Sequence, residues 1–300
     1  MIAFVLRRLA AAVLFVIVVS IAALILGRMA PADTGAFGGG RSAVTIAEER
    51  AAAGLDRPLL IQLRDWVVGL AYLDLGKSSV YKQPVRTLVL QRAGATAELG
   101  AVALLLATLI GVPCGILTGA RPRGALARLV SPVSIALIAC PPIVGALGLL
   151  LLAISTGWLS TAPGSLALPA LALALPLAAM LERLQSQATT EAIASPDLTA
   201  AAARGVSPFR LVWVHAARQS LRPVLGVYGI VIASLFSGSL AVEVITSWPG
   251  LGRLMASALT GREVFLTAGC ALAGAILIAA GNLIADVLRA IADPRVRGRA

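Results

Sequence analysis

The residues of this sequence that could carry chemistry include a short match to a phosphate-binding loop. Residues 71–79 read AYLDLGKSS, in which Ala71 is followed, after four positions, by Gly76, Lys77 and Ser78. Such a loop needs a buried strand before it, a helix after it and free backbone amides. Here the preceding residues, QLRDWVVGL, have helical periodicity, and Asp74 would place a carboxylate where phosphate charge must lie. We therefore interpret the match as a chance pattern.

Other reactive side chains lack the partners that chemistry requires. Ser237 and Ser239, in FSGSL, lie in an apolar stretch without a histidine to act as base, which disfavours a membrane hydrolase. His215 is the single histidine, and a metal site needs further ligands, so we expect a role in packing or at an interface. Three cysteines lie in apolar stretches without CxxC spacing and are expected to be packing residues: Cys114, Cys140 and Cys270.

The composition identifies the kind of protein that must position these residues. Hydrophobic residues make up 59% of the 300 residues and charged residues 13%, whereas about 25% charge is normal in soluble domains. The mean hydropathy is +0.92. The chain is therefore expected to be an all-α polytopic membrane protein in contact with the lipid bilayer.

Charge-free stretches predict six transmembrane helices. A helix needs about 20 residues to cross the roughly 30 Å hydrocarbon layer. The third stretch is long enough to cross twice, and STGWLSTAPGS at 155–165 interrupts it with turn formers. Its second half, roughly 164–181, is the weakest predicted span because it contains Pro169 and Pro176. The alternative is a chain with five spans, which would put its two ends on opposite sides of the membrane. The stretches are 9–27, 99–120, 129–181, 223–242 and 264–285.

The distribution of arginine predicts the orientation. Lys and Arg are concentrated in short cytoplasmic loops of membrane proteins. With the N-terminus inside, the short external loops hold only Arg253 and Arg262, and both ends are cytoplasmic. The net charge of +11 is then explained by basic loops that are retained on the cytoplasmic side. The sequence has no run of basic residues interleaved with aromatics, the pattern that would indicate nucleic-acid binding. Arg7 and Arg8 precede an apolar run longer than the usual signal-peptide core, so the first span is expected to be retained.

Two segments are more than membrane spans or short loops. Residues 30–94 are expected to form an extracytoplasmic cap, with a short helix ended by Gly54, a turn at 56–58, and a second amphipathic helix. This cap either protects the helix ends or meets a substrate-delivery partner. The second helix is expected to place five apolar residues on one side: Leu59, Leu60, Leu63, Trp66 and Val67.

The second segment, 189–223, is expected to be a pair of short helices on the cytoplasmic side. Asp197 can cap a helix that runs to Arg204, and Gly205 ends it. Ser207 and Pro208 suit the N-cap and first position of another helix, which runs to about Leu221. The small Ala-rich surface and the arginines would suit a surface that docks onto a partner protein. The alternative is an ordinary cytoplasmic loop that is basic because of the positive-inside rule.

Taken together, the motifs resemble the permease subunits of dipeptide and oligopeptide ABC importers, specifically the first of the two permeases in each transporter. The most specific match is SWPGLGRL at 247–254, before the last helix. Further matches are FVLRRL (4–9), GLDRP (54–58), DLGKS (74–78), ATAELG (95–100), ARGVSPFRLVWVHAARQSLRPV (203–224) and DPRVR (293–297). The resemblance implies a type I ABC importer permease fold with six transmembrane helices.

The resemblance also implies where this chain meets its energy source. In that family a cytoplasmic coupling helix, the EAA motif, sits in a groove of the ATPase. Carried over by position, the motif places its first residue at Thr199. The sequence departs from the family pattern at Asp197, Thr199 and Ala202, so its charge pairing with the ATPase is expected to differ from that of other family members. The implied coupling loop contains Thr199, Ala200, Ala201, Arg204, Gly205, Ser207, Pro208 and Arg210, with Pro223 closing it, and the family signature loop contains Ser247, Trp248, Pro249, Gly250, Leu251 and Gly252.

The partners and the domain organisation follow from the same resemblance. It implies a second homologous permease, two cytoplasmic ATPase subunits that use ATP and Mg, and an extracytoplasmic substrate-binding lipoprotein. This chain is then no enzyme and binds no cofactor or metal itself. The expected segments are 1–29 (N-terminal segment and first span), 30–94 (cap), 95–291 (transmembrane core) and 292–300 (cytoplasmic tail).

The expected function is ATP-driven import of di- or oligopeptides across the cytoplasmic membrane of a prokaryote by alternating access. Alternatives are a nickel chelate, haem or another peptide-sized cargo, or an ion-coupled secondary transporter. Two carboxylates lie near span ends, where charge is costly unless it faces protein or water. The family match at ATAELG suggests a structural pairing for Glu98, and Glu243 is expected to reach the external interface, with a place on the substrate path as the alternative for either.

Overall fold

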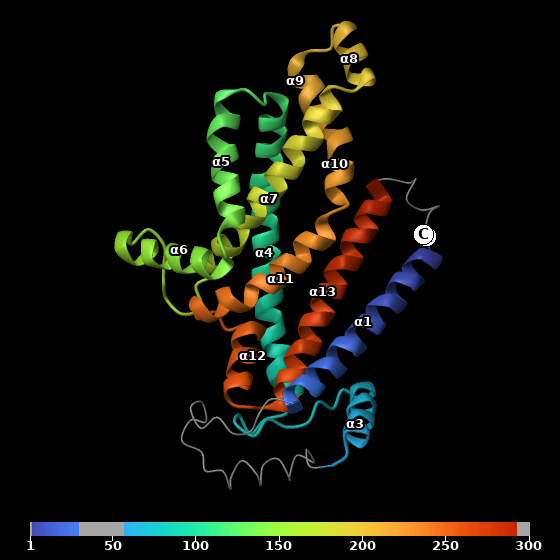
Figure 1. The fold of residues 1–300 in the computed structure, drawn as a ribbon, viewed down its shortest axis with the longest axis vertical. Helices are drawn as coiled ribbons and strands as arrows, with labels where there is room; N and C mark the ends of the chain where they lie inside the picture. The colour runs from blue at the N-terminus through green and yellow to red at the C-terminus, as the bar shows by residue number, and fades with distance from the viewer. Residues whose placement is uncertain (1, 30–56, 293–300) are drawn as a thin grey trace. The chain divides into compact units, whose positions relative to one another are not determined.

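The computed structural model describes residues 2–29 and 57–292 of the chain. Helices account for nearly all of these residues, and the described part contains no strand beyond an isolated bridge between Lys77 and Pro84. The elements, shown in Figure 1, are α1 (Ile2–Met29), α3 (Leu59–Ala71), α4 (Val85–Ala120), α5 (Ala125–Ala139), α6 (Pro142–Thr156), α7 (Ala167–Ile193), α8 (Pro196–Ala203), α9 (Pro208–Arg210), the π-helical segment η1 (Leu211–Ala216), α10 (Ala217–Leu225), α11 (Tyr228–Ile245), α12 (Leu251–Thr260) and α13 (Val264–Ala292).

Five helices are long and apolar enough to cross a membrane: α1, α4, α7, α11 and α13. A sixth span is possible if α5 and α6, which are bent by 113° at a short break, count as one. The all-helical fold with five or six candidate spans is therefore as predicted. The helix α4 begins at Val85, so the last part of the 30–94 segment is already helical and continuous with a span.

The first half of the 129–181 stretch, expected to form one span, is divided between two helices. The helix α5 ends at Cys140, whose backbone is extended, and α6 begins after Pro141. Proline disfavours helical geometry at the residue before it and supplies no N–H, so the pair Pro141-Pro142 ends one helix and starts the next. The break predicted at 155–165 is confirmed, because α6 ends with Gly157 in the left-handed conformation.

The fourth span is present as α7 and is the least apolar of the five candidate spans, but it is longer than expected. The helix α7 continues well past Leu181 and is the most buried of the candidate spans. Pro176 lies inside it and is tolerated, since neighbouring helices surround this part of α7. The expected end near Leu181 was too early, because the second half of α7 carries polar residues that are buried against other helices.

The chain divides into two compact units, each with its own packing. Unit 1 comprises Met1–Val5, Glu98–Trp248 and Gly281–Ala300. Within it, α5, α6, α10 and α11 each pack against α7, and α6 also packs against α11. Figure 1 shows α7 running through the middle of this group of helices. The helix α7 is therefore the central support of unit 1.

A glycine stripe lets α4 approach α7 closely. Gly111, Gly115 and Gly119 follow one another at intervals of four residues and so share one helix face. A Cβ added at Gly115 would lie 2.6 Å from the Glu182 carbonyl oxygen, and one at Gly111 would lie 2.5 Å from that of Ala178. No side chain larger than hydrogen fits at these positions, as in other membrane helix pairs that meet at small residues.

Unit 2 comprises Leu6–Ala97 and Pro249–Ala280 and has a separate hydrophobic core. The core joins residues of α1, α3, the first part of α4, α12 and the first part of α13. Trp66 lies at its centre, where the indole Nε1 donates a hydrogen bond to Ser20 Oγ at 2.7 Å and the ring stacks on Phe265 with 5.9 Å between centroids. Cys270, buried in this core, is a packing residue as predicted.

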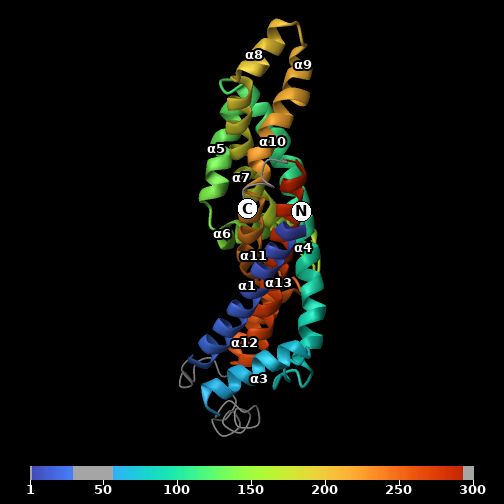
Figure 2. The same ribbon diagram turned by 90° about the vertical axis from the view of Figure 1, so that its right-hand side faces the viewer.

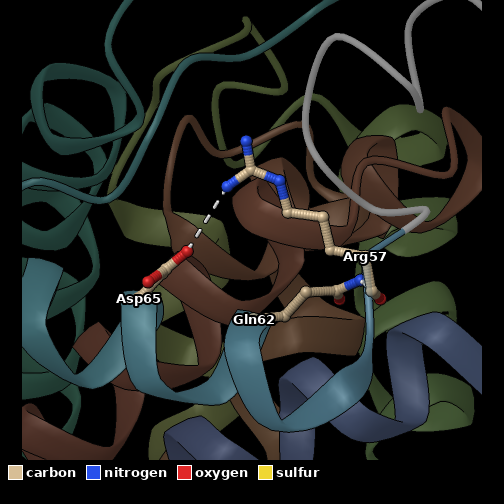
Figure 3. A network of polar contacts seen from close by, with 3 residues as sticks. All are labelled: Arg57, Gln62 and Asp65. Atoms are coloured by element: carbon tan, nitrogen blue, oxygen red, sulfur yellow. Dashed lines mark hydrogen bonds and ion pairs between the residues drawn. The ribbon is translucent and has the colours of Figure 1, made fainter.

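The predicted second helix of the 30–94 segment is confirmed as α3, but its buried face differs. Gln62 and Trp66 are buried, whereas Leu60 and Val67 are exposed. Gln62 Nε2 donates to the Arg57 carbonyl oxygen at 2.8 Å, and the Arg57 guanidinium lies 3.7 Å from the Asp65 carboxylate, as Figure 3 shows. Both charged groups are exposed, so this pair contributes little stability. The predicted helix before Gly54 and the tail at 293–300 lie outside the described residues.

Candidate functional site

The two short helices predicted for residues 189–223 are present at one end of unit 1. Figures 1 and 2 show α8 and α9 beyond the ends of α7 and α10. The helix α8 begins after Ser195, with Pro196 at its first position, so the prediction that Asp197 caps it was wrong. Asp197 lies in the first turn, where its charge is favourable beside the helix N-terminus. The second helix begins with Ser207 as N-cap and Pro208 at its first position, as predicted.

Gly205 ends α8, as predicted, and turns the chain. Its φ is +85°, a conformation that favours glycine. Gly205 N–H donates to the Ala202 carbonyl oxygen at 3.0 Å, and Val206 N–H donates to that of Ala201 at 3.3 Å. These paired bonds close the helix end and fix the direction in which the next helix starts.

The side chains of this helical pair divide into a buried set, which includes Leu198 and Ala201 of α8, and an exposed surface. Ala201 is buried, and nearby Ala192, Leu198 and Ala216 form a small core that joins the end of α7, α8 and η1. The other residues predicted for this loop are all exposed: Thr199, Ala200, Arg204, Gly205, Ser207, Pro208 and Arg210. The pair is therefore packed from inside and presents a surface of small and cationic side chains.

A π-helical segment and two exposed aromatic side chains were not predicted. The second helix runs without interruption from Pro208 to Leu225, beyond the predicted end near Leu221, and residues 211–216 are π-helical. Phe209 is 73% exposed, and its ring centroid lies 6.4 Å from that of Trp213. His215 is exposed in the same segment, which rules out a packing role within the described residues and keeps an interface role as the prediction. Such π segments are frequent at functional sites.

A buried polar network joins this loop to the span α7. Gln185 Nε2 donates to Ser220 Oγ at 2.7 Å and to Thr189 Oγ1 at 3.1 Å, and Thr189 Oγ1 donates to Ser220 Oγ at 3.3 Å. All three residues are buried. Because Ser220 belongs to α10 and the others to α7, a displacement of the loop is transmitted to α7 or breaks these bonds.

A second buried network, centred on Glu182, ties α7 to two other helices. The Glu182 carboxylate accepts hydrogen bonds from Thr118 Oγ1 of α4 at 2.7 Å and from Ser134 Oγ of α5 at 2.8 Å. Neither this network nor Gln185 was predicted. The available signal was the set of polar residues spaced three and four apart beyond Leu181, which places Glu182, Gln185 and Thr189 on one helix face.

The residues of the predicted signature loop, 247–252, are divided between the two units, with Ser247 and Trp248 in unit 1 and residues 249–252 in unit 2. In unit 1, Ser247 has a φ of +56°, and Trp248 is buried with its N–H donating to the Glu243 carbonyl oxygen at 3.0 Å. In unit 2, the Pro249 carbonyl oxygen accepts a bond from Arg92 at 3.1 Å, and Leu251 N–H donates to Thr96 Oγ1 at 2.7 Å. The loop is thus held firmly by each unit.

The two carboxylates singled out from the sequence both differ from expectation. Glu243 is fully buried, so the prediction that it reaches an external interface was wrong. Glu98 is exposed on α4, and the described residues offer it no ion pair or side-chain hydrogen bond, so the expected pairing is not found within this part of the chain. Exposure at a span end leaves Glu98 accessible to another subunit or to solvent.

The GKS segment is a turn that binds a carboxylate of its own chain. Gly76 has a φ of +76°, and its N–H donates to Asp74 Oδ1 at 3.0 Å. Ser78 Oγ and Ser79 N–H donate to the two carboxylate oxygens of Glu263, each at 2.9 Å. The segment is therefore a turn, and two of its donors bind Glu263, in agreement with the interpretation of the nucleotide-loop match as a chance pattern.

The remaining reactive side chains form no catalytic group in the part of the chain that is described. Ser239 Oγ donates to the Phe236 carbonyl oxygen at 2.9 Å, so its hydroxyl is used within its own helix. Cys114 and Cys140 are partly exposed free thiols. Across residues 2–29 and 57–292, no three His, Cys, Asp or Glu side chains come together in a way that could hold a metal ion.

Comparisons with known proteins place the chain in a family. The model of the binding-protein-dependent transport system inner membrane component matches residues 111–298, and the model of the N-terminal part of such membrane components matches residues 1–99. The chain is 31% identical to the oligopeptide transport system permease protein AppB of Bacillus subtilis, covering 81% of this chain and 82% of that protein. It is 28% identical to the dipeptide transport system permease protein DppB of Escherichia coli, covering 99% of each.

Among solved structures, an inward facing form of the MetNI methionine ABC transporter resembles the chain. The TM-score is 0.60 at 19% identity, and the likeness covers 69% of this chain and 96% of that one. This likeness concerns the fold, and it agrees with the all-helical architecture expected for a type I importer permease.

Proposed function

This chain belongs to the family of binding-protein-dependent transport system inner membrane components, and from that membership we propose that it is the permease subunit of an ATP-driven importer of di- and oligopeptides. The proposal of peptide as cargo rests on the relatives, AppB and DppB, whose names specify oligopeptide and dipeptide transport. The chain aligns with 82% of the first and 99% of the second, so the likeness extends well beyond one shared segment.

The helical pair between α7 and α10 is the surface that meets the ATPase in this proposal. The observation that carries it is the exposed, small-residue surface of α8 around Ala200, closed by Gly205 and supported by its own buried core. Small side chains let another surface approach the α8 backbone closely. Arg204 and Arg210 add positive charge for an acidic partner surface.

Movement of that surface reaches the membrane through α7. When two ATPase subunits close on ATP, the helical pair moves with them, and the network of Gln185, Thr189 and Ser220 carries α7 along. A second permease forms the other half of the pore, and a substrate-binding protein delivers peptide from outside. ATP and the loaded binding protein favour one conformation of the permease pair by differential binding, and the pair alternates between this conformation and the inward-open one, which is alternating access.

In this proposal the chain itself hydrolyses no ATP. The GKS segment, whose donors bind Glu263, is a structural turn, and ATP with Mg is used by the separate ATPase subunits. The orientation follows the arginine distribution, with the α7–α10 loop and both chain ends cytoplasmic and the α12 loop outside. Other peptide-sized cargo, such as a nickel chelate or haem, would be distinguished by uptake assays with each compound in a deletion strain.

The test of the coupling surface compares two tryptophan substitutions at exposed alanines. Ala200 is the better position because Ala201 is buried and its enlargement would disturb the loop itself. We expect Ala200→Trp to reduce co-purification of the ATPase subunits and peptide uptake at least tenfold, a loss of about 1.4 kcal/mol in association. Ala125→Trp, at an exposed alanine of α5 outside the loop, is the control and should retain both. Full uptake by an assembled Ala200→Trp complex would contradict the assignment.

A further inference from the structure

A group of arginines in unit 1 is not used by the coupling mechanism described above. The chain has no acidic residue between Glu98 and Glu182, and the charged residues within that range are Arg121, Arg123 and Arg128. All three are exposed and lie directly after the end of α4. The charge of this long apolar part of unit 1 is therefore concentrated in residues 121–128, which we call the arginine turn.

The arginine turn is short and tightly closed. Helix α4 ends at Ala120, and α5 begins at Ala125. Between them the Gly124 N–H donates to the Arg121 carbonyl oxygen at 2.9 Å, and a Cβ added at Gly124 would lie 3.0 Å from that oxygen. Arg128 lies one turn into α5, and long side chains on a helix lean toward its N-terminus. The three guanidinium groups therefore gather around one turn of the backbone.

These guanidinium groups are unpaired within the part of the chain that the structure describes. No carboxylate of residues 2–29 or 57–292 forms an ion pair with Arg121, Arg123 or Arg128. The buried carboxylate of Glu182, on the adjoining helix α7, is bound by hydroxyl groups of α4 and α5 instead. Guanidinium groups bind phosphate oxygens through paired, charge-assisted hydrogen bonds, so an anion with a phosphate group matches the arginine turn.

Exposed apolar side chains adjoin the arginine turn on both helices. Leu117 is exposed near the end of α4, and Leu126, Leu129 and Val133 are exposed on α5, Leu129 by 70%. Charge thus begins where a lipid-facing apolar surface ends. In a bilayer this boundary lies between the acyl chains and the headgroups, so the arginine turn is expected at the level of the lipid phosphates.

The short connection favours a lipid over a protein partner. Residues 121–124 join two membrane helices directly, so the turn cannot extend far from the membrane surface. Figures 1 and 2 show α8 and α9 extending beyond it, where a partner protein is more accessible. In the orientation proposed above the arginine turn is cytoplasmic, and the cytoplasmic leaflet carries anionic lipids that attract basic segments.

We propose that the arginine turn is a binding site for an anionic phospholipid, whose phosphate contacts Arg121, Arg123 and Arg128 and whose acyl chains lie against the exposed apolar side of α5. The site uses the orientation proposed above and is independent of the cargo. A lipid bound there would hold the ends of α4 and α5 at the membrane surface while the helical pair of α8 and α9 moves with the ATPase.

The test measures the affinity of the complete importer, in a zwitterionic detergent, for phosphatidylglycerol with a fluorescent acyl chain, followed by anisotropy. We expect Arg121→Gln/Arg123→Gln to weaken binding at least about tenfold, because each basic residue near an anionic lipid surface contributes roughly fivefold. Arg128 remains, so the loop keeps a basic residue. The matched control is Arg218→Gln/Arg222→Gln, which removes two exposed arginines of α10 and should change the affinity less than about twofold.

Labelled phosphatidylcholine separates a binding site from a purely topological role of the arginines. Wild type should bind it at least about tenfold more weakly than phosphatidylglycerol. Equal affinity for the two lipids overturns the site, because the arginines would then only retain the loop on the cytoplasmic side. Equal weakening by the two double variants also overturns it, since binding would follow overall charge.

The remaining outcomes separate this site from a protein contact and from the proposed function. Loss of the ATPase or the second permease from Arg121→Gln/Arg123→Gln, at unchanged lipid affinity, overturns the site and assigns these arginines to a protein partner. If that variant fails to assemble, Arg123→Gln alone must weaken lipid binding at least about threefold. The binding measurement needs no transport, so wild type that binds phosphatidylglycerol but shows no ATP-driven peptide uptake contradicts the proposed function and supports the site.

Discussion

At the scale of single residues, Glu182 has the most consequential environment in the described chain. It is 4% exposed and accepts hydrogen bonds from hydroxyl groups of two other helices, which satisfies its carboxylate in an apolar surrounding. Arg183, the next residue, donates to Ser131 Oγ of α5 at 3.2 Å. Adjacent charged residues therefore join α7 to α4 and α5 by directed bonds rather than by apolar contact alone.

Removing the Glu182 carboxylate should destabilise unit 1. Glu182→Ala leaves two buried hydroxyl groups without their acceptor and opens a cavity, which we expect to cost roughly 1–3 kcal/mol for the lost bonds. Glu182→Gln keeps an acceptor and the shape of the side chain, so its loss should be smaller. Glu191→Ala, at an exposed position of the same helix, is the control and should be neutral. The measurement is the fraction of monodisperse protein after heating in detergent, and equal Tm values for Glu182→Ala and Glu191→Ala would contradict this role.

The sequence predicted residues whose role is local and missed those whose role depends on packing. Gly205, Ser207 and Pro208 were placed correctly because helix ends are determined by backbone chemistry within a few residues. Neither the role of Glu182, whose hydroxyl partners lie 64 and 48 residues away in the sequence, nor the full burial of Glu243 was predicted. A prediction from hydropathy ends a membrane span at such a carboxylate. Hydrogen bonds from a neighbouring helix can nevertheless stabilise the carboxylate inside the protein.

At the scale of elements, the contact of α4 with α7 depends on the absence of side chains. The glycine stripe at 111, 115 and 119 brings α4 so close to the α7 backbone that Thr190 Oγ1 donates to the Gly119 carbonyl oxygen at 3.0 Å. The same close approach places Thr118 within reach of Glu182. The stripe is therefore a precondition for the polar bonds between these helices.

An alanine at the middle of the stripe should separate the helices. A Cβ at Gly115 would lie 2.6 Å from the Glu182 carbonyl oxygen, and overpacking of this kind typically costs about 1–3 kcal/mol. Gly148→Ala on α6 is the matched control, since a Cβ there meets nothing within 4 Å and alanine is the better helix former. We expect a lower Tm and reduced peptide uptake for Gly115→Ala only. A Tm for Gly115→Ala equal to or above that of wild type would show that α4 and α7 tolerate a wider spacing.

The elements themselves were largely predictable from hydropathy and turn residues, with three exceptions. The break between α5 and α6 was missed because an apolar stretch without charge was treated as continuous, although Pro141 and Pro142 indicated where a helix must end. The length of α7 was missed because its second half is polar and buried. The π-helical segment at 211–216 has no signal that we recognise in the sequence.

At the scale of the whole molecule, the account depends on the two loops facing opposite sides of the membrane. The α7–α10 loop must be cytoplasmic to meet the ATPase, and α12 must be outside, on the side from which peptide is delivered. Both placements are proposed from the arginine distribution. The sequence indicates this topology, but contacts with other subunits depend on surfaces that a single chain does not reveal.

Cysteine labelling should show the two sides directly. In a background without the three native cysteines, Thr260→Cys on α12 should react with a membrane-impermeant maleimide added to intact cells, since Thr260 is exposed. Ser207→Cys, exposed at the start of α9, should react only after the membrane is permeabilised. Labelling of Ser207→Cys in intact cells, or of both positions alike, would contradict the proposed orientation.

The most direct test of the central claim is peptide uptake by proteoliposomes that contain the complete importer. We predict that a labelled dipeptide or oligopeptide accumulates only when the binding protein, ATP and Mg are all present on their proper sides. Collapse of the proton and sodium gradients should leave that accumulation intact, because the driving force is ATP binding and hydrolysis in the partner subunits. Uptake that persists without ATP and disappears with an ion gradient would contradict the account and identify an ion-coupled carrier instead.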